Sequence, residues 1–372
     1  MSISATLDNR TPFAAKSIVL PDAEGQEVLL VLVCATFVVD ADGLVRCADA
    51  QRPAALSDVY RGAPGLSSLL READLALEKP AVDVLVNGTA YAPGGRPAKQ
   101  VPVGVLAGDV RKQLLISGDR GWRTGPLGRA PSSPKPFDCM PIVYERSFGG
   151  AVGAAPQGQP RAVDARNPIG VGFEGARSMD LAIETELPNV ESPTDLVYSP
   201  ADAPTPSGLG AVGRGWSPRV RFAGTYDEAW RRSRWPFLPL DFDARFNQSA
   251  PPDQQSRTLQ GGEMVRIVNL TPEGEWSFRL PKLQVPIRHF YDDRHLESHL
   301  RVDTVLIEPD ARTVVLTGRS VVRTVRNTGA LREVVIGHVT PAWLRARVAR
   351  KLHVDHRRGE GEVRNAGRHF EL

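Results

Sequence analysis

The chain of 372 residues has only three cysteines and no long hydrophobic run, and each shortage excludes a class of protein. Cys34, Cys47 and Cys139 show no CxxC spacing and no even number for a disulfide framework, which favours a reducing compartment. The longest apolar run, 28–39, has 12 residues and contains Thr36, whereas a membrane-spanning helix needs about 20. The first residues, MSISATLDNRTPF, lack a basic start followed by an apolar stretch. We therefore expect a cytoplasmic protein with no membrane partner.

The motifs of two common enzyme classes are also missing. No GxxxxGK[ST] phosphate loop and no GxSxG nucleophile motif occurs in the sequence. Gly170, Gly172 and Gly175 do form a GxGxxG, which in a dinucleotide site follows directly after a strand. The preceding stretch here, QGQPRAVDARNP, cannot form a buried strand. We predict a tight loop at these glycines and no cofactor.

A histidine cluster is the one arrangement that resembles a metal site. His295 and His299 are four residues apart and would share a helix face, with His289 upstream and Asp292 and Asp293 between. Zinc accepts such ligands. A zinc protease motif, however, needs Glu directly after the first His, and Leu296 stands there. We predict a polar, solvated turn between two strands and no metal.

Glycine and proline are abundant, while one-sided charge is not. The 34 glycines and 31 prolines make up about 17% of the chain, against an average near 12%, which indicates many turns and short elements. The net charge is only +3, and 7 of the 46 basic residues are Lys. So small an excess gives no reason to expect a nucleic-acid partner.

The chain divides by composition into β-rich parts at 1–120 and 262–338 and a loop- and aromatic-rich part at 121–261, where Gly and Pro reach 24%. Short β-branched runs bounded by turn residues predict strands. Helical spacing of leucines predicts a helix over 66–76, and Thr340 before Pro341 predicts a last helix to about 352. We expect a mainly β fold of antiparallel sheets, a sandwich-like scaffold with long irregular loops and a few short helices, in which the two β-rich parts pack together. The predicted strands are 27–39, 82–91, 101–106, 111–117, 264–269, 276–280, 283–290, 302–307, 313–316, 320–326 and 334–338, with a hairpin at Pro309-Asp310.

The C-terminal segment 341–372 is basic, with eight Lys and Arg residues against four acidic ones. It includes Arg345, Arg347 and Arg350. One interpretation is a helix that docks on the sheet and has a frayed basic end. The other is a basic surface for an acidic protein partner, and these three arginines are then candidate partner-binding residues.

A second candidate region is the segment 223–254, where Tyr, Trp, Arg and Asp are dense. If Thr225 caps a short helix, Tyr226 and Trp230 lie on one face, and Arg231, Arg232 and Arg234 point elsewhere, available to acidic groups on a partner. The aromatic face should then hold the segment to the sheet. The predicted structural anchors are Tyr226, Trp230, Trp235, Asp241, Phe242 and Asp253.

The same segment carries a family resemblance. AGTYDEAW, LPLDFDARF and APPDQ, with PFDCMPIVYERSFGG, NPIGVGF, GGEMVRIVNLTPEG and RVDTVLIEPD, stand in an order that resembles the DUF2169 family of bacteria. The likeness covers about residues 8–340, which suggests a single family domain over 1–340 and a basic helix and tail at 341–372. Genes of this family accompany those of type VI secretion spikes and effectors.

The resemblance implies a non-enzymatic adaptor or chaperone that binds a type VI effector and helps to load it onto a VgrG or PAAR spike protein. It carries over no catalytic residue. Two alternatives stay open. An enzyme acting on the effector or the cell envelope would draw on Asp227, Asp241, Asp253 or the histidine cluster. A structural or carbohydrate-binding spike accessory is the other.

Overall fold

The computed structural model describes residues 5–126, 128–151, 162–173, 186–326, 329–349 and 351. Strand accounts for 42% and helix for 11%, which confirms the mainly β prediction. The largest unit is a seven-stranded sheet in which most neighbours are antiparallel. Its strands in spatial order are β17 (Gln255–Ser256), β7 (Val82–Val86), β22 (Arg301–Glu308), β23 (Thr313–Arg323), β3 (Glu27–Val39) and β2 (Ala14–Pro21), with β4 (Val45–Cys47) also paired to β3.

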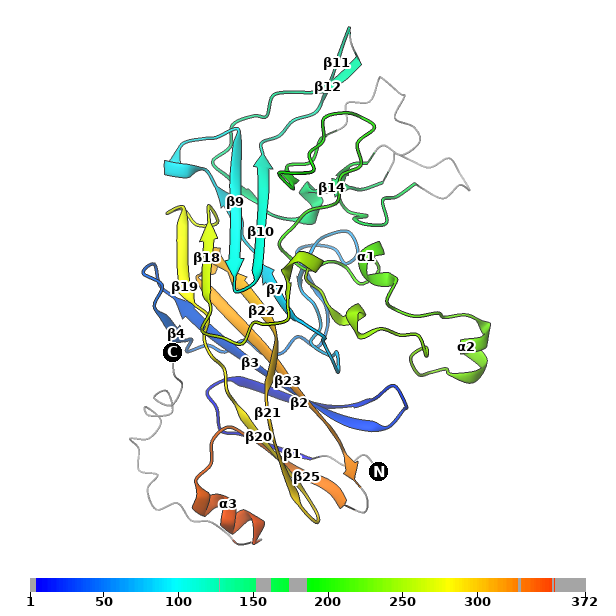
Figure 1. Cartoon of the computed structure of the whole chain (residues 1–372), viewed down its shortest axis with the longest axis vertical. Coiled ribbons are helices and arrows are strands. Elements are labelled where there is room, and N and C mark those ends of the chain that lie inside the picture. The colour runs from blue at the N-terminus through cyan, green and yellow to red at the C-terminus, as the bar shows by residue number, and fades with distance from the viewer. Residues whose placement is uncertain are drawn as a thin grey trace.

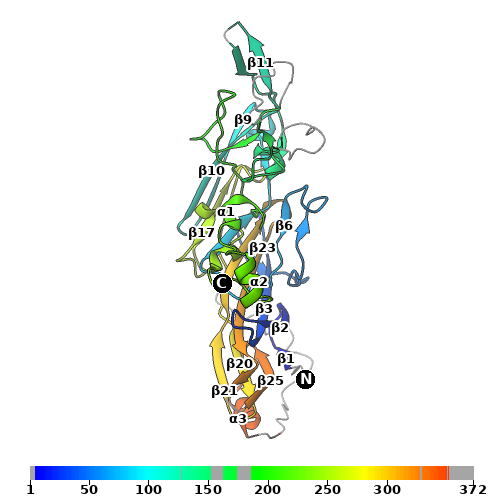
Figure 2. The same cartoon turned by 90° about the vertical axis from the view of Figure 1, so that its right-hand side faces the viewer.

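Two five-stranded sheets complete the scaffold. The second sheet runs β16 (Val190–Glu191), β10 (Val110–Ser117), β9 (Gln100–Ala107), β18 (Met264–Val268) and β19 (Glu275–Arg279). The third sheet runs β1 (Thr6–Asn9), β25 (Gly329–Ile336), β20 (Pro286–Tyr291) and β21 (His295–His299), with β24 (Val325–Arg326) beside β25. The second sheet lies toward the upper end of the molecule and the third toward the lower end, with the seven-stranded sheet between them (Figures 1 and 2).

The remaining elements are short. Two-stranded ribbons are formed by β11 (Trp122–Gly125) with β12 (Gly128–Pro131), β13 (Cys139–Pro141) with β8 (Thr89–Tyr91), β14 (Phe148–Gly149) with β15 (Val171–Gly172), and β5 (Val59–Tyr60) with β6 (Leu69–Arg71). The α-helices are α1 (Ser217–Val220), α2 (Glu228–Ser233) and α3 (Pro341–Val348). The 3-10 helices among the described residues are η1 (Pro93–Gly95), η2 (Tyr144–Arg146), η4 (Ala244–Asn247), η5 (Pro252–Gln254) and η6 (Pro309–Ala311).

The first and last parts of the chain interleave within the sheets. β3 lies between β2 and β23, β7 lies beside β22, and β9 lies beside β18. Neither part could close these sheets by itself, because each supplies strands that the other must pair. The expectation that the two β-rich parts pack together is therefore confirmed.

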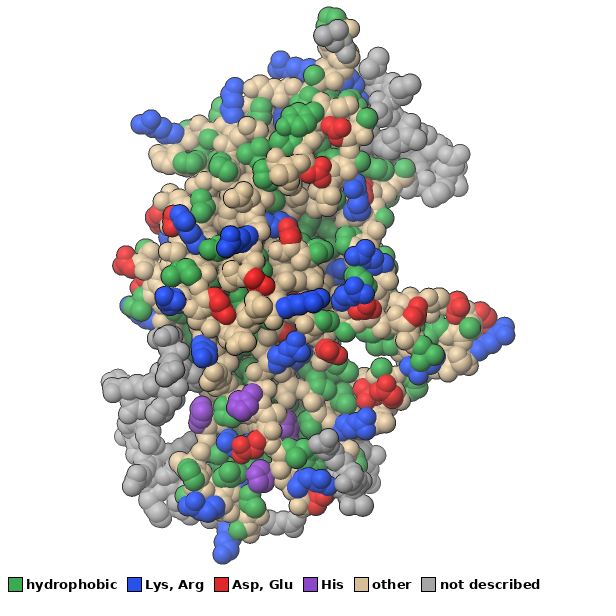
Figure 3. Space-filling view, viewed as in Figure 1, with side chains coloured by type: hydrophobic (Ala, Val, Ile, Leu, Met, Phe, Trp, Pro, Cys, Tyr) green, Lys and Arg blue, Asp and Glu red, His purple; other side chains and the backbone are tan. Residues whose placement is uncertain are grey.

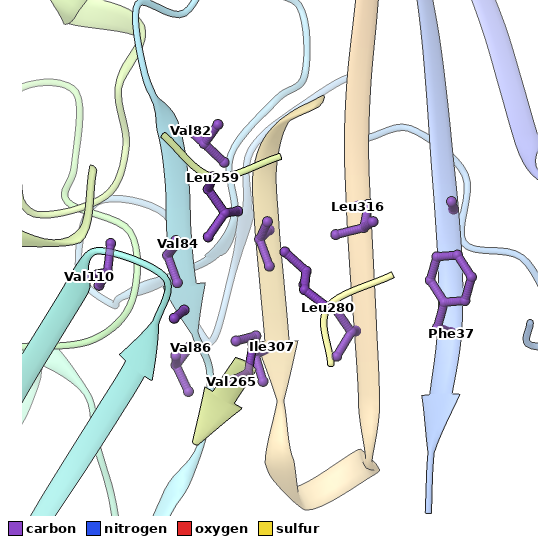
Figure 4. Close-up of a cluster of buried hydrophobic side chains, with 14 of the residues drawn as sticks. Phe37, Val82, Val84, Val86, Val110, Leu259, Val265, Leu280, Ile307 and Leu316 are labelled. Atoms are coloured by element: carbon purple, nitrogen blue, oxygen red, sulfur yellow. The ribbon is translucent and has the colours of Figure 1, made fainter. Parts of the chain in front are cut away.

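The core explains the long apolar run of β3. Alternate residues of a strand point to opposite faces, and here both faces are covered. Leu29, Val31 and Val33 belong to the main core cluster, whereas Cys34 belongs to a second cluster on the other face, with Leu85 and Leu306. Figure 4 shows the main cluster, where side chains of β7, β22, β23 and β3 meet those of the second sheet. The run is thus a buried central strand, and no helix among the described residues could span a bilayer.

The helix predicted over 66–76 is wrong. The chain forms β6 there, with irregular residues on both sides, and Leu66 is exposed while Leu69 is buried. The backbone N–H of Ser68 donates to Glu145, and the carboxylate of Asp74 accepts from the N–H of Ala55. These contacts with distant residues replace the hydrogen bonds of a helix, so tertiary structure overrides the local spacing.

Most predicted strands are present with shifted ends. The segment 82–91 is two strands, β7 and β8, and the segments 313–316 and 320–326 are covered by one strand, β23, followed by β24. The hairpin at Pro309-Asp310 is confirmed, and Arg312 completes its turn in the left-handed region at φ 53°. Thr340 caps α3 as predicted by accepting from the N–H of Trp343, but the helix ends at Val348.

Labelling of the cysteine thiols tests this packing directly. Cys34 is fully buried in β3, and burial raises its pKa to about 11, while Cys47 and Cys139 are exposed. Because only an accessible thiolate reacts with a disulfide reagent, we expect two thiols to be labelled in the native protein and three in denaturant. Cys34→Ala should give two in both states. Rapid labelling of three thiols in the native protein would contradict the burial of β3.

Candidate functional site

Residues 222–243 form a projection that we call the arm, and α2 lies in it (Figure 1). The arm closes at its root, where the N–H of Asp243 donates to the carbonyl of Phe222 over 3.0 Å. The Asp241 carboxylate accepts from the Thr225 N–H at 2.9 Å and from its hydroxyl at 2.7 Å. These hydrogen bonds lower the pKa of Asp241, so the carboxylate that ties the root together stays ionised.

The helix of the arm begins two residues later than the sequence predicts. Asp227, and not Thr225, caps α2, with its carboxylate 2.8 Å from the N–H of Trp230. Both residue types make good caps, but the hydroxyl of Thr225 is already bound to Asp241. The prediction of a short helix is right and that of its cap is wrong.

Tyr226 and Trp230 pack against each other within the arm. Tyr226 and Trp230 meet edge to face with ring centroids 4.7 Å apart, as their spacing predicts. The indole N–H of Trp230 donates to the carbonyl of Phe237 at 2.9 Å. Tyr226 and Trp235 are 53% and 67% exposed. The expectation that these two rings anchor the segment to the sheet is therefore wrong.

The three other predicted anchors lie at or beyond the root. Asp241 holds the root, as described, and Phe242 packs edge to face on Phe246 at 5.9 Å. Asp253 lies in η5 and forms an ion pair of 2.7 Å with Lys112 of β10. The Phe242–Phe246 contact joins the base of the arm to the segment that follows it, and the Asp253–Lys112 pair joins that segment to β10.

The outer part of the arm rests on the turn between β2 and β3, a contact that sequence reasoning missed. Arg234 donates to the carbonyl of Ala23 at 2.7 Å and to that of Leu238 at 3.1 Å. Gly25 has a φ of +80°, and a Cβ on it would lie 2.5 Å from the Phe237 ring. Arg234 is therefore used by the fold, which corrects its assignment as a residue available to a partner.

What the arm leaves exposed is a mixed surface of apolar and basic side chains. We call it the arm surface, and it consists of Tyr226, Arg231, Arg232, Trp235, Leu238 and Leu240. Leu240 is 85% exposed, and the Arg231 and Arg232 side chains are 75% and 77% exposed, both beside Glu228. Figure 3 shows the arm projecting from one side of the molecule, with an opening between it and the body and both basic and acidic side chains at its outer end. The four exposed apolar residues lie close together in the chain, and large exposed apolar side chains are typical of interaction sites.

Of the three candidate arginines in the C-terminal segment, the structure describes two. Arg345 is exposed, but Arg347 donates to Glu333 of β25 at 2.7 Å, and Arg350 lies outside the described residues. Helix α3 docks through Trp343, which lies 6.1 Å from the Phe290 ring and under Arg10. Docking of the helix on the sheet is thus the interpretation that the structure supports.

A cavity of about 770 Å³ lies between α3 and the third sheet. Its charged lining is arranged as ion pairs, namely Arg10 with Asp8, Arg294 with Asp293, Arg332 with Asp292, and Arg347 with Glu333. Each of these four arginines already has a carboxylate, and Lys351 adds a further positive charge to the lining.

The acidic residues of the enzyme alternative are engaged in structural contacts. Asp227 caps α2, Asp241 closes the root, and Asp253 pairs with Lys112. His295 and His299 lie in strand β21, which corrects the prediction of a solvated turn, and His289 is buried in β20. Within the part of the chain that the structure describes, no group of three His, Cys, Asp or Glu residues could hold a metal ion. Gly170 and Gly172 flank the first residue of β15, and Gly175 falls outside the described residues.

The comparisons with known proteins give one finding. A family model described as "Uncharacterized protein conserved in bacteria (DUF2169)" matches residues 24–319, which is well over half of the chain. No curated protein and no solved structure is significantly similar to the chain.

Proposed function

We propose, from the premise that this chain belongs to the DUF2169 family of uncharacterized proteins conserved in bacteria, that it is a non-enzymatic adaptor for type VI secretion. In this role it binds an effector in the cytoplasm and helps to bring it to a VgrG or PAAR spike protein. The arm surface is the part that contacts the effector.

The observation that carries the proposal is the composition of the arm surface. Trp, Tyr and Arg are the residue types that contribute most to protein interfaces, and the arm presents all three with two exposed leucines. A buried apolar side chain is worth about 1.5–3 kcal/mol when it leaves water. The arm exposes several apolar side chains, and its root is closed by its own hydrogen bonds. We infer from this that the arm binds a protein partner.

The proposal is tested by co-expression of the tagged protein with the products of neighbouring genes. We expect one effector to co-purify, and Arg231→Glu with Arg232→Glu to reduce its capture at least tenfold. The melting temperature should hardly change, because exposed ion pairs contribute under about 1 kcal/mol.

A matched charge reversal elsewhere provides the control. Arg46 of β4 and Arg266 of β18 are also exposed and each lies beside one carboxylate, Asp40 and Glu275. Their strands lie on the opposite side of Figure 1 from the arm. Arg46→Glu with Arg266→Glu should leave capture intact. If no neighbouring gene product binds the wild-type protein, the proposed function is wrong.

A further inference from the structure

We infer that a cavity beside β11, which we call the β11 cavity, binds a ligand through a single carboxylate group. The cavity has a volume of about 770 Å³ and lies near the upper end of Figure 1, far from α3 at the lower end. It is lined by residues of the segments 119–123, 132–135, 145–146 and 186–189, and by Val171. None of these residues belongs to the arm, so the inference goes beyond the proposed function and does not depend on it.

Backbone contacts fix the walls of the β11 cavity. The N–H of Leu187 donates to the carbonyl of Arg120 at 3.0 Å, and the N–H of Lys135 donates to that of Asp119 at 3.0 Å. A Cβ on Gly118 would lie 1.8 Å from the Lys135 carbonyl oxygen, so only glycine permits this close approach of the two segments. The cavity is therefore a hollow whose walls are set by the main chain and not by exposed side chains alone.

Two buried N–H groups of the lining residues have no acceptor in the described structure. They are the Nε of Arg120 and the indole Nε1 of Trp122. The Arg120 side chain and Trp122 are each only 8% exposed. The two residues are two positions apart, the spacing that places side chains on the same side of an extended chain. Native proteins satisfy nearly all buried N–H groups, so two unsatisfied donors at one cavity point to an acceptor that a ligand supplies.

A carboxylate is the acceptor that these two donors favour. The guanidinium of Arg120 already donates through Nη2 to Glu191, and its free Nε carries part of the same positive charge. Hydrogen bonds between a charged donor and a carboxylate are roughly twice as strong as neutral ones. The two oxygens of a carboxylate can also accept from Arg120 and Trp122 together, whereas a neutral amide offers one oxygen for both donors and no negative charge.

The other charges of the site limit the charge of the ligand. Arg123 and Lys135 are exposed, and neither has a carboxylate partner among the described residues. Across the whole site, however, four cations are matched by four carboxylates. Because a neutral site exerts no long-range attraction on a polyanion, the buried donors, and not net charge, select a ligand with one carboxylate. The cations are Arg120, Arg123, Lys135 and Arg146, and the carboxylates are Asp119, Glu145, Glu186 and Glu191.

Binding should be visible at Trp122 itself. Its Nε1 is shielded from solvent, and Trp122 belongs to a cluster with Phe148, Leu187 and Val197, so a ligand oxygen reaches the N–H only when the ring shifts. The experiment is therefore NMR of the full chain with isotope-labelled tryptophan, in which each of the six indoles gives one signal. Replacement of each Trp by Phe in turn assigns the signal of Trp122.

Three probes separate the possible ligands. They are N-acetylglycine, with a carboxylate like that of a chain terminus, the α-amide of N-acetylglutamate, with a side-chain carboxylate, and the α-amide of N-acetylglutamine, the neutral control. We expect at least one carboxylate probe to move the indole N–H signal of Trp122 downfield until it saturates, and the glutamine probe to leave the signal in place. The carboxylate probe that binds more tightly shows whether a chain terminus or an acidic side chain is the source.

Trp122→Phe keeps an aromatic ring and removes the donor, so we expect it to weaken binding of the same probe at least tenfold in calorimetry. Trp343→Phe is the matched control, because Trp343 lines the cavity beside α3, and it should bind the probe as the wild type does. No shift of the Trp122 signal with either carboxylate, an equal shift with the glutamine probe, or full affinity of Trp122→Phe would each overturn the inference. If Trp122→Phe folds poorly, the variants of the other five tryptophans still assign the signal, and the wild-type titration decides. Neither result bears on effector capture by the arm.

Discussion

Asp83→Ala is expected to lower the free energy of unfolding by about 3–5 kcal/mol, the cost of leaving one partner of a buried ion pair alone. Asp83 lies in β7 and is fully buried, and Lys79 beside it is 7% exposed. The carboxylate accepts from the Lys79 ammonium at 2.8 Å, from the Gln248 amide at 2.6 Å, and from the N–H and hydroxyl of Ser249. Alanine would leave all of these buried donors without their acceptor and out of contact with water.

A comparison of the loss of unfolding free energy among three variants gives a sharper test. Lys79→Met should cost less than Asp83→Ala, because the carboxylate keeps its other three donors and Thr304 loses only one partner. Glu275→Gln is the control, since Glu275 and Arg266 are both about half exposed and such pairs contribute under about 1 kcal/mol. The measurement is urea unfolding followed by tryptophan fluorescence. A loss for Asp83→Ala no larger than for Glu275→Gln would contradict the buried network.

The strands could be predicted from the sequence because their signal is local. The run 27–39 is β3 to the residue, since apolar β-branched residues bounded by Asp and Gly suit a strand buried on both faces. The failure at 66–76 shows the limit of this signal. Its leucines have helical spacing, but Ser68 binds Glu145, which is 77 residues away, and no pattern within the segment reveals that partner.

The candidate site also has one part that could be predicted from the sequence and one part that could not. The contact between Tyr226 and Trp230 could be predicted because it depends on helical spacing alone. Whether the segment lies on the sheet or projects from it depends on the hydrogen bond from Arg234 to Ala23, 211 residues earlier in the chain. One available sign was Leu240, an apolar residue between Pro239 and Asp241, where a turn would leave it exposed.

The second large effect is expected for Trp276→Ala, which should cost about 3–5 kcal/mol as a large-to-small change in the core. Trp276 lies in β19 and is 1% exposed. Its ring is 4.8 Å from that of Phe278, Arg312 lies over it, and its indole N–H donates to the carbonyl of Asp40 at 3.0 Å. Alanine would leave a cavity between the second sheet and the β3–β4 turn, and would remove one of the two hydrogen bonds that the Asp40 carbonyl accepts, the other coming from the Gly43 N–H.

Trp235→Ala removes the same side chain from the arm, where it is 67% exposed, and is therefore the matched control. We expect a change well below that of Trp276→Ala in the urea midpoint, with the slope of the transition unchanged in both variants. Trp276→Phe should recover part of the loss, because it refills most of the cavity but cannot donate to Asp40. Equal destabilisation by the two alanine variants would mean that the arm is part of the cooperative core, and that its exposed side chains are not free to enter a partner.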